Sequence, residues 1–94
     1  MTVRTIADIT PNGAAVPLST DLNARAIYIV MTATGSTIRT GDSNVGSGRG
    51  ALLPTGVLTT PYPRQDNEQQ PYQLAHVYVY GASGADKVSI TYGT

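Results

Sequence analysis

The sequence predicts a small all-β protein, an antiparallel sandwich or barrel of jelly-roll type with about seven short strands and essentially no helix. Threonine, valine, isoleucine and tyrosine dominate its apolar stretches, and ten glycines and six prolines interrupt them at short intervals. Helix formers are scarce, because the chain has one glutamate, one lysine and no sustained apolar period of about 3.6 residues. The 94 residues are enough for one domain.

The N-terminal half contains three expected strands. Residues 3–9 and 14–18 are short β-rich segments, although residues 1–12 could instead form an extended arm that lies along a neighbouring molecule. Residues 24–33 are apolar at both odd and even positions, which predicts a central strand covered on both faces by a second sheet or another subunit. Between them, residues 19–23 are the best candidate for a single helical turn, capped by serine or threonine.

Turn residues divide the middle of the chain. Thr34-Gly35-Ser36 predicts a tight turn into a strand over residues 37–40, and the glycines of residues 41–50 predict a loop with several positive-φ positions. A strand over residues 52–58 is interrupted by Pro54 and Gly56. Prolines within sheets are found at edges and bends, so Pro17 and Pro54 indicate such positions for their segments.

Two further strands follow near the C-terminus. Apolar and polar residues alternate over residues 75–80 and 87–92, and residues 81–86 are the length of a hairpin loop. We therefore expect one antiparallel ribbon with four aliphatic side chains turned inward: Val77, Val79, Val88 and Ile90. Residues 60–72, rich in proline and polar side chains, predict an exposed loop.

Charge and composition exclude several classes of protein. Six basic and six acidic residues give a net charge of zero, and the basic residues are spread singly, so we expect no nucleic-acid partner. Charged residues are 13% of the chain, about half the usual share, which suits a surface covered in an assembly. No apolar run approaches the length of a membrane span, so no membrane partner is expected. The absence of cysteine excludes disulfides and thiolate zinc sites.

The residues that carry chemistry form no recognisable catalytic or metal-binding pattern. His76 is the only histidine and stands in an expected strand, without the serine and carboxylate that a catalytic triad needs. Asp66-Asn67-Glu68 lacks the spacing of a calcium loop, and residues 46–50 lack the lysine and following helix of a phosphate-binding loop. We therefore predict no enzyme activity, no metal and no cofactor.

Tyrosine is the sole aromatic residue type, and two of its six copies bracket the exposed loop. Tyr62 and Tyr72 stand at either side of the polar run 64–70. Tyrosine gives a large contact area at low entropic cost, so it is common at interfaces as well as in sheets. Two interpretations stay open: these tyrosines pack within the fold, or they contact a partner protein or a glycan.

The order of several segments resembles the small all-β virion proteins of tailed bacteriophages, in which a strand, a Gly-Asp-Ser-x-Val turn, a Gly-x-x-Leu-x-Pro-Gly turn and a closing hairpin recur. The matching segments are ARAIYI at 24–29, IRTGDSNV at 38–45, GRGALLPTG at 48–56, LAHVYV at 74–79 and GADKVSITY at 84–92. The resemblance covers about residues 22–93, with Thr55 inserted between Pro54 and Gly56.

This resemblance implies a structural protein of the virion, assembled in the host cytoplasm. The expected function is head decoration: a cement protein that binds the major capsid protein or other virion proteins as a symmetric oligomer, a trimer or a dimer. The alternative is a head-fibre or tail module that contacts other virion proteins or the host surface. The candidate interface residues are Val3, Arg4, Ile6, Asp42, Asn44, Val45, Arg49, Tyr62, Arg64, Tyr72, His76, Tyr78 and Tyr80.

Overall fold

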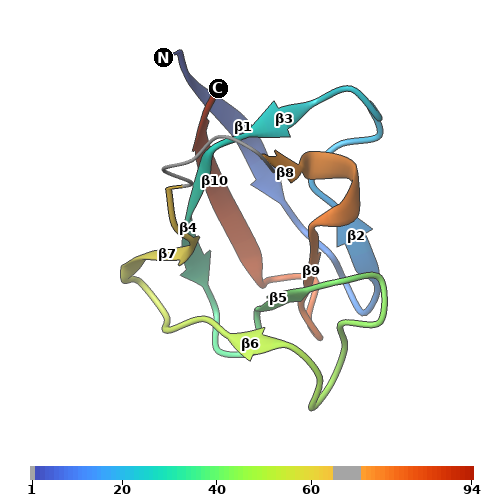
Figure 1. Ribbon diagram of the computed structural model, residues 1–94. Coiled ribbons are helices and arrows are strands. Elements are labelled where there is room, and N and C mark those ends of the chain that lie inside the picture. The colour runs from blue at the N-terminus through green and yellow to red at the C-terminus, as the bar shows by residue number, and fades with distance from the viewer. Residues whose placement is uncertain (1, 65–70) are drawn as a thin grey trace.

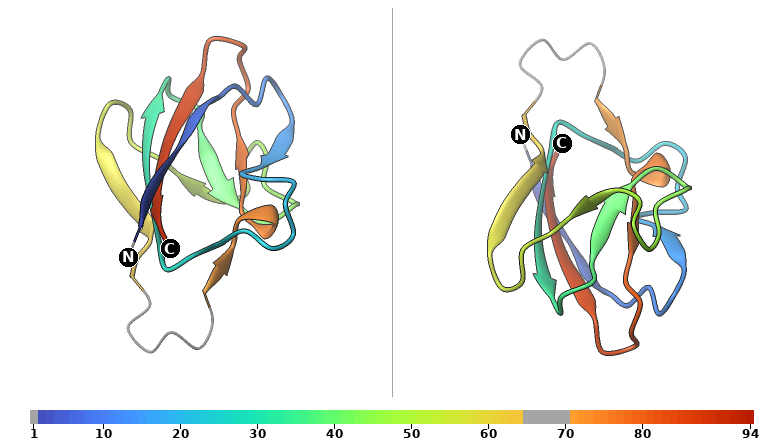
Figure 2. Two further views of the ribbon diagram at one scale, coloured as in Figure 1. Left: turned by 90° about the horizontal axis from the view of Figure 1, so that it is seen from above. Right: turned by 90° about the horizontal axis from the view of Figure 1, so that it is seen from below.

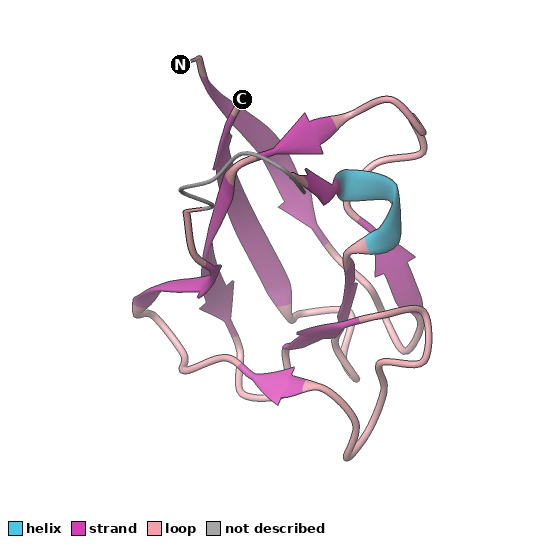
Figure 3. Cartoon of the chain, in the orientation of Figure 1, coloured by secondary structure: helices cyan, strands magenta, loops and turns pink. Residues whose placement is uncertain are grey.

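The computed structural model describes residues 2–64 and 71–94, and strands dominate this part of the chain (Figures 1 and 3). One 3₁₀ turn, η1, is the only helical element among these residues. The elements are β1 (Val3–Ile9), β2 (Ala15–Pro17), β3 (Arg25–Ala26), β4 (Tyr28–Thr34), β5 (Arg39–Gly41), β6 (Ala51–Leu52), β7 (Leu58–Tyr62), β8 (Tyr72–Gln73), η1 (Leu74–His76), β9 (Tyr78–Tyr80) and β10 (Lys87–Gly93).

The all-β prediction is confirmed, with ten described strands in place of about seven. Two expected strands are each divided: residues 24–33 form β3 and β4, and residues 52–58 contribute to β6 and β7. The first break falls at Ile27, whose backbone N–H bonds the Gly93 carbonyl at 2.8 Å outside the regular ladder. The remaining strand, β8, has two residues and has no counterpart among the predicted strands.

Two four-stranded antiparallel sheets enclose the core (Figure 2). Sheet 1 has the order β1-β10-β4-β7, and sheet 2 has the order β2-β9-β5-β6. A short ribbon of β3 and β8 completes the structure. The proline prediction is confirmed at β2, an edge strand that contains Pro17, and at Pro54, which lies in the connection between β6 and β7.

The core forms between the inward faces of these sheets. In β4 and in the first half of β10 every second side chain is buried, as the period of two in a strand dictates. The outward residues of β4, which include Tyr28 and Val30, are half-buried in the single chain. The buried cluster consists of Leu18, Ala26, Ile29, Met31, Ala33, Ile38, Leu53, Leu74, Val77, Val79, Val88 and Ile90.

The predicted ribbon of the last two strands is wrong. β9 pairs with β2 and β5 in sheet 2, whereas β10 pairs with β1 and β4 in sheet 1. The connection over residues 81–86 crosses from one sheet to the other because it is tied to the turn after β4. The Thr37 hydroxyl donates to the carboxylate of buried Asp86 and accepts the Ala82 N–H at 3.0 Å. The predicted inward residues are nevertheless buried.

Two local predictions also need correction. His76 is in η1 and not in a strand, since the Val77 N–H bonds the Leu74 carbonyl at 3.3 Å and β9 begins only at Tyr78. Residues 19–23 form no helical turn. The Ser19 hydroxyl accepts the Asp21 N–H at 3.0 Å, and the Asp21 carboxylate accepts the Asn23 N–H at 2.9 Å, which are local bonds that compete with helix.

The N-terminal segment is part of sheet 1. β1 pairs with β10 in a register that places Val3 opposite Gly93 and Ile6 opposite Ile90. An extended arm over residues 1–12 would therefore require β1 to leave this sheet, because in the single chain the backbone of β1 already has a partner. In the described residues, no helix is long and apolar enough to cross a membrane.

Candidate functional site

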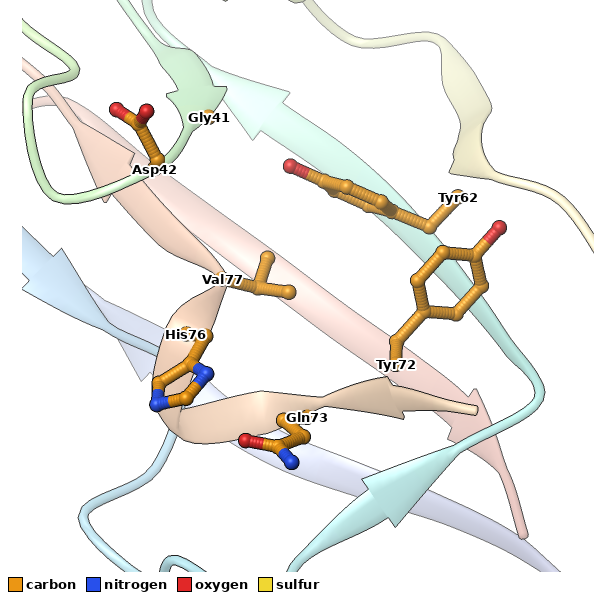
Figure 4. Close-up of a pocket in the computed structure, with 7 residues that line it drawn as sticks. All are labelled: Gly41, Asp42, Tyr62, Tyr72, Gln73, His76 and Val77. Carbon is orange, nitrogen blue, oxygen red and sulfur yellow. The ribbon is translucent and has the colours of Figure 1, made fainter. Parts of the chain in front are cut away.

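A cleft of about 420 Å³ opens where β5, β7, β8 and η1 meet (Figure 4). Separate segments of the chain contribute to it, and sheet pairing brings them together: β7 belongs to sheet 1, β5 to sheet 2, and β8 to the short ribbon. Its size is within the range of small-molecule sites. The lining residues are Gly41, Asp42, Tyr62, Tyr72, Gln73, His76 and Val77.

Two tyrosines form one wall of the cleft. The rings of Tyr62 and Tyr72 meet edge to face, with centroids 5.4 Å apart and planes at 71°. Tyr62 is opposite Ile29 in the β4–β7 register, and Tyr72 is opposite Ala26 in the β3–β8 register. Both rings are half-buried against the core cluster, so the strands β7 and β8 set their placement.

The hydroxyl groups of both tyrosines are engaged within the chain. The Tyr62 hydroxyl is 3.0 Å from the Thr40 hydroxyl, which in turn donates to the Tyr78 carbonyl at 3.0 Å. The Tyr72 hydroxyl donates to the Pro63 carbonyl at 2.8 Å. These bonds fix the two rings, and the rings therefore offer the cleft mainly their apolar surface.

Polar side chains stand around the rim. One carboxylate oxygen of Asp42, Oδ1, accepts the Asn44 N–H at 2.9 Å, and the other makes no hydrogen bond within the described residues. The side chains of Gln73 and His76 likewise make none there. Asp42 and His76 are exposed, Gln73 is half-buried, and buried Val77 forms the floor between them (Figure 4).

The cleft gathers four of the candidate residues named from the sequence: Asp42, Tyr62, Tyr72 and His76. Sequence reasoning missed Gln73, which occupies a strand too short to show any alternation. The glycines of residues 41–50 predicted a loop at Gly41 and Asp42, but they did not indicate which residues lie opposite that loop.

The other candidate residues lie elsewhere. Val45 is 6% exposed and contributes to folding, and Ile6 is half-buried and packs against the core cluster. Val3 and Arg4 are exposed on the edge strand β1. Three more polar side chains are exposed in loops, Asn44, Arg49 and Arg64, and two tyrosines are half-buried in β9, Tyr78 and Tyr80.

The glycine-rich loop after β5 folds back on itself. Gly46 and Arg49 form a two-way backbone bridge, with N···O distances of 3.2 and 3.0 Å. Gly48 and Gly50 have φ angles of 79° and 97°, which confirms the prediction of positive-φ positions. The bridge makes this loop a compact turn and not a phosphate cradle, since it leads directly into β6 and not into a helix.

The described residues include no group of three or more histidine and carboxylate side chains that could hold a metal ion. The Asp66-Asn67-Glu68 run and the centre of the predicted exposed loop, residues 65–70, lie outside the described part of the chain. What the cleft offers is binding chemistry: two aromatic rings, one carboxylate, one amide and one imidazole.

A second surface feature is a set of three exposed apolar side chains, Leu52, Val57 and Leu58, along the segment that joins the two sheets, here called the apolar edge. Their side chains are 54%, 53% and 70% exposed, and no charged residue occurs between Arg49 and Arg64. The segment contains β6 and β7, the edge strands of the two sheets. The opposite edge of sheet 1 differs, because β1 carries exposed Arg4 and Asp8, the kind of charge that discourages association of edge strands.

Comparison of the chain with models of protein families, with curated proteins and with solved structures gave no match.

Proposed function

We propose that this chain is a non-enzymatic structural protein of a tailed-bacteriophage virion, a head decoration (cement) protein that binds the assembled shell as a symmetric trimer or dimer. The sequence segments that resemble small all-β virion proteins support this assignment, and so does the low share of charged residues, 13%. The observation that carries the proposal is the apolar edge, whose three exposed side chains lie on a stretch of chain without charged residues and can pack against another protein.

The apolar edge suits association because its side chains are far from buried in the single chain. Covering a leucine or valine side chain contributes about 1.5–3 kcal/mol when the side chain goes from exposed to buried. A ligand that binds only the assembled shell stabilises it by mass action, without chemistry. Several copies joined in one oligomer bind a symmetric lattice more strongly than one copy does.

The contact is expected to use side chains more than added strands. Pro61 lies within β7 and has no N–H to donate, so a partner strand could not pair along the whole of β7. Leu58 faces outward opposite Thr32 in the β4–β7 register, and Leu52 pairs with Arg39 in sheet 2. A shell surface that covers these leucine side chains would bury their exposed apolar area.

The test is co-sedimentation of purified protein with undecorated shells. The variant Leu52→Glu/Leu58→Glu should lose at least tenfold in shell affinity while its circular dichroism stays unchanged, because both side chains are exposed. The control is Leu22→Glu, which introduces one such charge at a leucine 68% exposed in the turn between β2 and β3. Equal binding by both variants and the parent protein would contradict the assigned contact.

Size-exclusion chromatography with light scattering gives the oligomeric state, for which we expect a trimer or a dimer. The alternative function is a head-fibre or tail module that contacts virion proteins or the host surface. The cleft favours this second function, because rings and polar groups around a hollow are typical of ligand recognition. A protein that ignores shells but associates with purified tails would replace the cement proposal with this one.

A further inference from the structure

We propose that the cleft between β5, β7, β8 and η1 binds a neutral saccharide, with one pyranose ring seated against Tyr62 and Tyr72. This inference does not depend on the proposed head contact, since the apolar edge residues do not line the cleft.

The aromatic wall matches the apolar face of a sugar. A pyranose presents a set of C–H groups on one face, and these pack against an aromatic ring. Because the hydroxyls of Tyr62 and Tyr72 are bonded to Thr40 and to the Pro63 carbonyl, the rings are held in place before any ligand arrives. In Figure 4 the Tyr72 ring is seen face-on and the Tyr62 ring nearly edge-on, so the pair forms a corner. A wall that is fixed in advance costs less to order on binding.

The rim matches the hydroxyls of a sugar. A sugar hydroxyl both donates and accepts, and the rim supplies both kinds of partner: the Asp42 carboxylate accepts, and the Gln73 amide and the His76 imidazole each donate and accept. Within the described residues, the Gln73 and His76 side chains and the second oxygen of Asp42 make no hydrogen bond, so none has to be broken. Buried Val77 keeps the floor apolar.

The charge of the lining selects against other ligands. No lysine or arginine is among the described residues that line the cleft, and Asp42 brings a negative charge. A phosphate or an acidic sugar would therefore meet repulsion without a compensating cation. A purely apolar ligand would leave the polar groups of the rim without partners, which costs free energy. A neutral polyhydroxyl compound with one apolar face satisfies both requirements.

Another hollow in the chain lacks the paired rings and the cation-free lining of the described cleft residues. It has a volume of about 400 Å³ and is lined by Arg4, Asp21, Asn23, Ala24, Arg25, Tyr92 and Thr94. It has a single aromatic ring and two arginines, one of which already donates to the Leu22 carbonyl at 2.6 Å. The first cleft has paired rings, and its described lining residues include no lysine or arginine.

The experiment is an NMR titration of the ¹⁵N-labelled protein with methyl glycosides of glucose, galactose, mannose and N-acetylglucosamine, and with glucuronic acid as the charged comparison. At least one neutral glycoside should shift the amides of residues 41–42, 62 and 72–77 with a Kd of about 1–10 mM, as expected for an open site that holds one ring. Glucuronic acid should bind at least fivefold more weakly. No shift with any neutral glycoside at about 50 mM, or equal binding of glucuronic acid, would overturn the proposal.

Variants locate the site. Gln73→Ala and His76→Ala remove rim groups that hold nothing else in place among the described residues, and each should weaken binding by about fivefold with folding unchanged. Tyr72→Ala should abolish binding, and Tyr80→Ala is its control, a half-buried tyrosine of β9 outside the cleft. If Tyr72→Ala unfolds, the two rim variants still decide, because unchanged affinity in both would contradict the assignment.

Two sources of the sugar can be separated in the same way. Soluble neutral polysaccharide and lipopolysaccharide purified from a host bacterium are each titrated against parent protein and Gln73→Ala. Binding to lipopolysaccharide alone assigns the cleft to a cell-surface glycan. Binding to both polysaccharides assigns it to the sugar unit itself. Retention that Gln73→Ala leaves unchanged, or no retention by either, would overturn a role in glycan binding. All cleft variants should co-sediment with shells as the parent protein does, which keeps the two proposals distinguishable.

Discussion

Side-chain hydrogen bonds join the two sheets at both ends of the sandwich, through short side chains at one end and through tyrosine rings at the other. At the closed end, where the β9–β10 connection meets the turn after β4, the short side chains of Thr37 and Asp86 bond directly. At the cleft end, Tyr62 and Tyr72 reach across with long rings and bond Thr40 and the Pro63 carbonyl. Short groups let the chain segments approach closely, so that a Cβ at Gly35 would overlap the Asp86 carboxylate, and the hollow beside Thr37 and Ala82 is only about 190 Å³. Long rings that lean on one another leave a space beside them, and that space is the cleft.

The largest expected effect comes from a substitution in the core, which supports both ends. Ile90 is 1% exposed in β10, between Ile6 of β1 and Met31 of β4. Ile90→Ala removes buried methyl groups and leaves a cavity, so the free energy of unfolding should fall by about 3–4 kcal/mol in urea denaturation. Ser89→Ala, at the exposed neighbour in the same strand, should change it by less than about 0.5 kcal/mol. Similar losses in the two variants would show that β10 is not a core strand.

A smaller effect should come from crowding the closed end. Gly35 has φ +113°, and a Cβ placed there would overlap the carboxylate of Asp86. Gly35→Ala should therefore lower the free energy of unfolding by about 2–3 kcal/mol, the sum of a strained φ and a displaced carboxylate. Gly13 provides the matched control, since it has φ +84° and a Cβ there would meet nothing within 4 Å, so Gly13→Ala should cost only about 1 kcal/mol. Equal losses in the free energy of unfolding would mean that a Cβ at position 35 meets no steric conflict with Asp86.

Removing the carboxylate tests the same end in another way. Asp86 is 8% exposed and accepts the Thr37 hydroxyl, so Asp86→Ala should lower the free energy of unfolding by about 1–2 kcal/mol in urea denaturation. Asp8→Ala, at an exposed aspartate of β1, is the control and should be nearly neutral.

The two closed-end changes should also be coupled. In an Asp86→Ala background the carboxylate is gone, and the nearest remaining atom to a Cβ at Gly35 is the Asp86 Cβ at 3.1 Å. The double variant should then lose about 1 kcal/mol less than the sum of the single variants. Strict additivity would show that the carboxylate is not what excludes a side chain from position 35.

The difference between the ends also explains which features the sequence could predict. The β-rich composition of residues 3–9 identified β1 over its full length, and alternation identified the inward residues of β9 and β10, because burial on one face leaves a period of two. It could not give the partner of each strand. Residues 81–86 are short enough for a hairpin, and the bond that redirects them joins Asp86 to Thr37, 49 positions earlier.

The same limit applies to the cleft. Tyr62 and Tyr72 stand out in the sequence because they bracket one loop, but Asp42 and His76 are candidates for unrelated reasons. Only the pairing of β4 with β7, of β5 with β9 and of β3 with β8, together with the packing of the sheets, brings these four residues to one place. Gln73 had no signal at all, since a two-residue strand shows no period. Residue types therefore indicated the chemistry of the site, and long-range topology, which local patterns do not encode, determined its membership.

The smallest expected effect lies at the cleft end, where Tyr62→Phe removes one hydroxyl and keeps the ring. The Thr40 hydroxyl still donates to the Tyr78 carbonyl, so no buried donor is left unpaired and the free energy of unfolding should fall by only about 0.5–1 kcal/mol. Saccharide affinity should fall about two- to threefold, because the ring remains but is held less firmly. Tyr92→Phe, at a tyrosine outside the cleft, should leave the affinity unchanged in the same titration. A loss above about 2 kcal/mol would show that the hydroxyl at this end is as tightly enclosed as the Asp86 carboxylate at the other, and the contrast between the two ends would no longer hold.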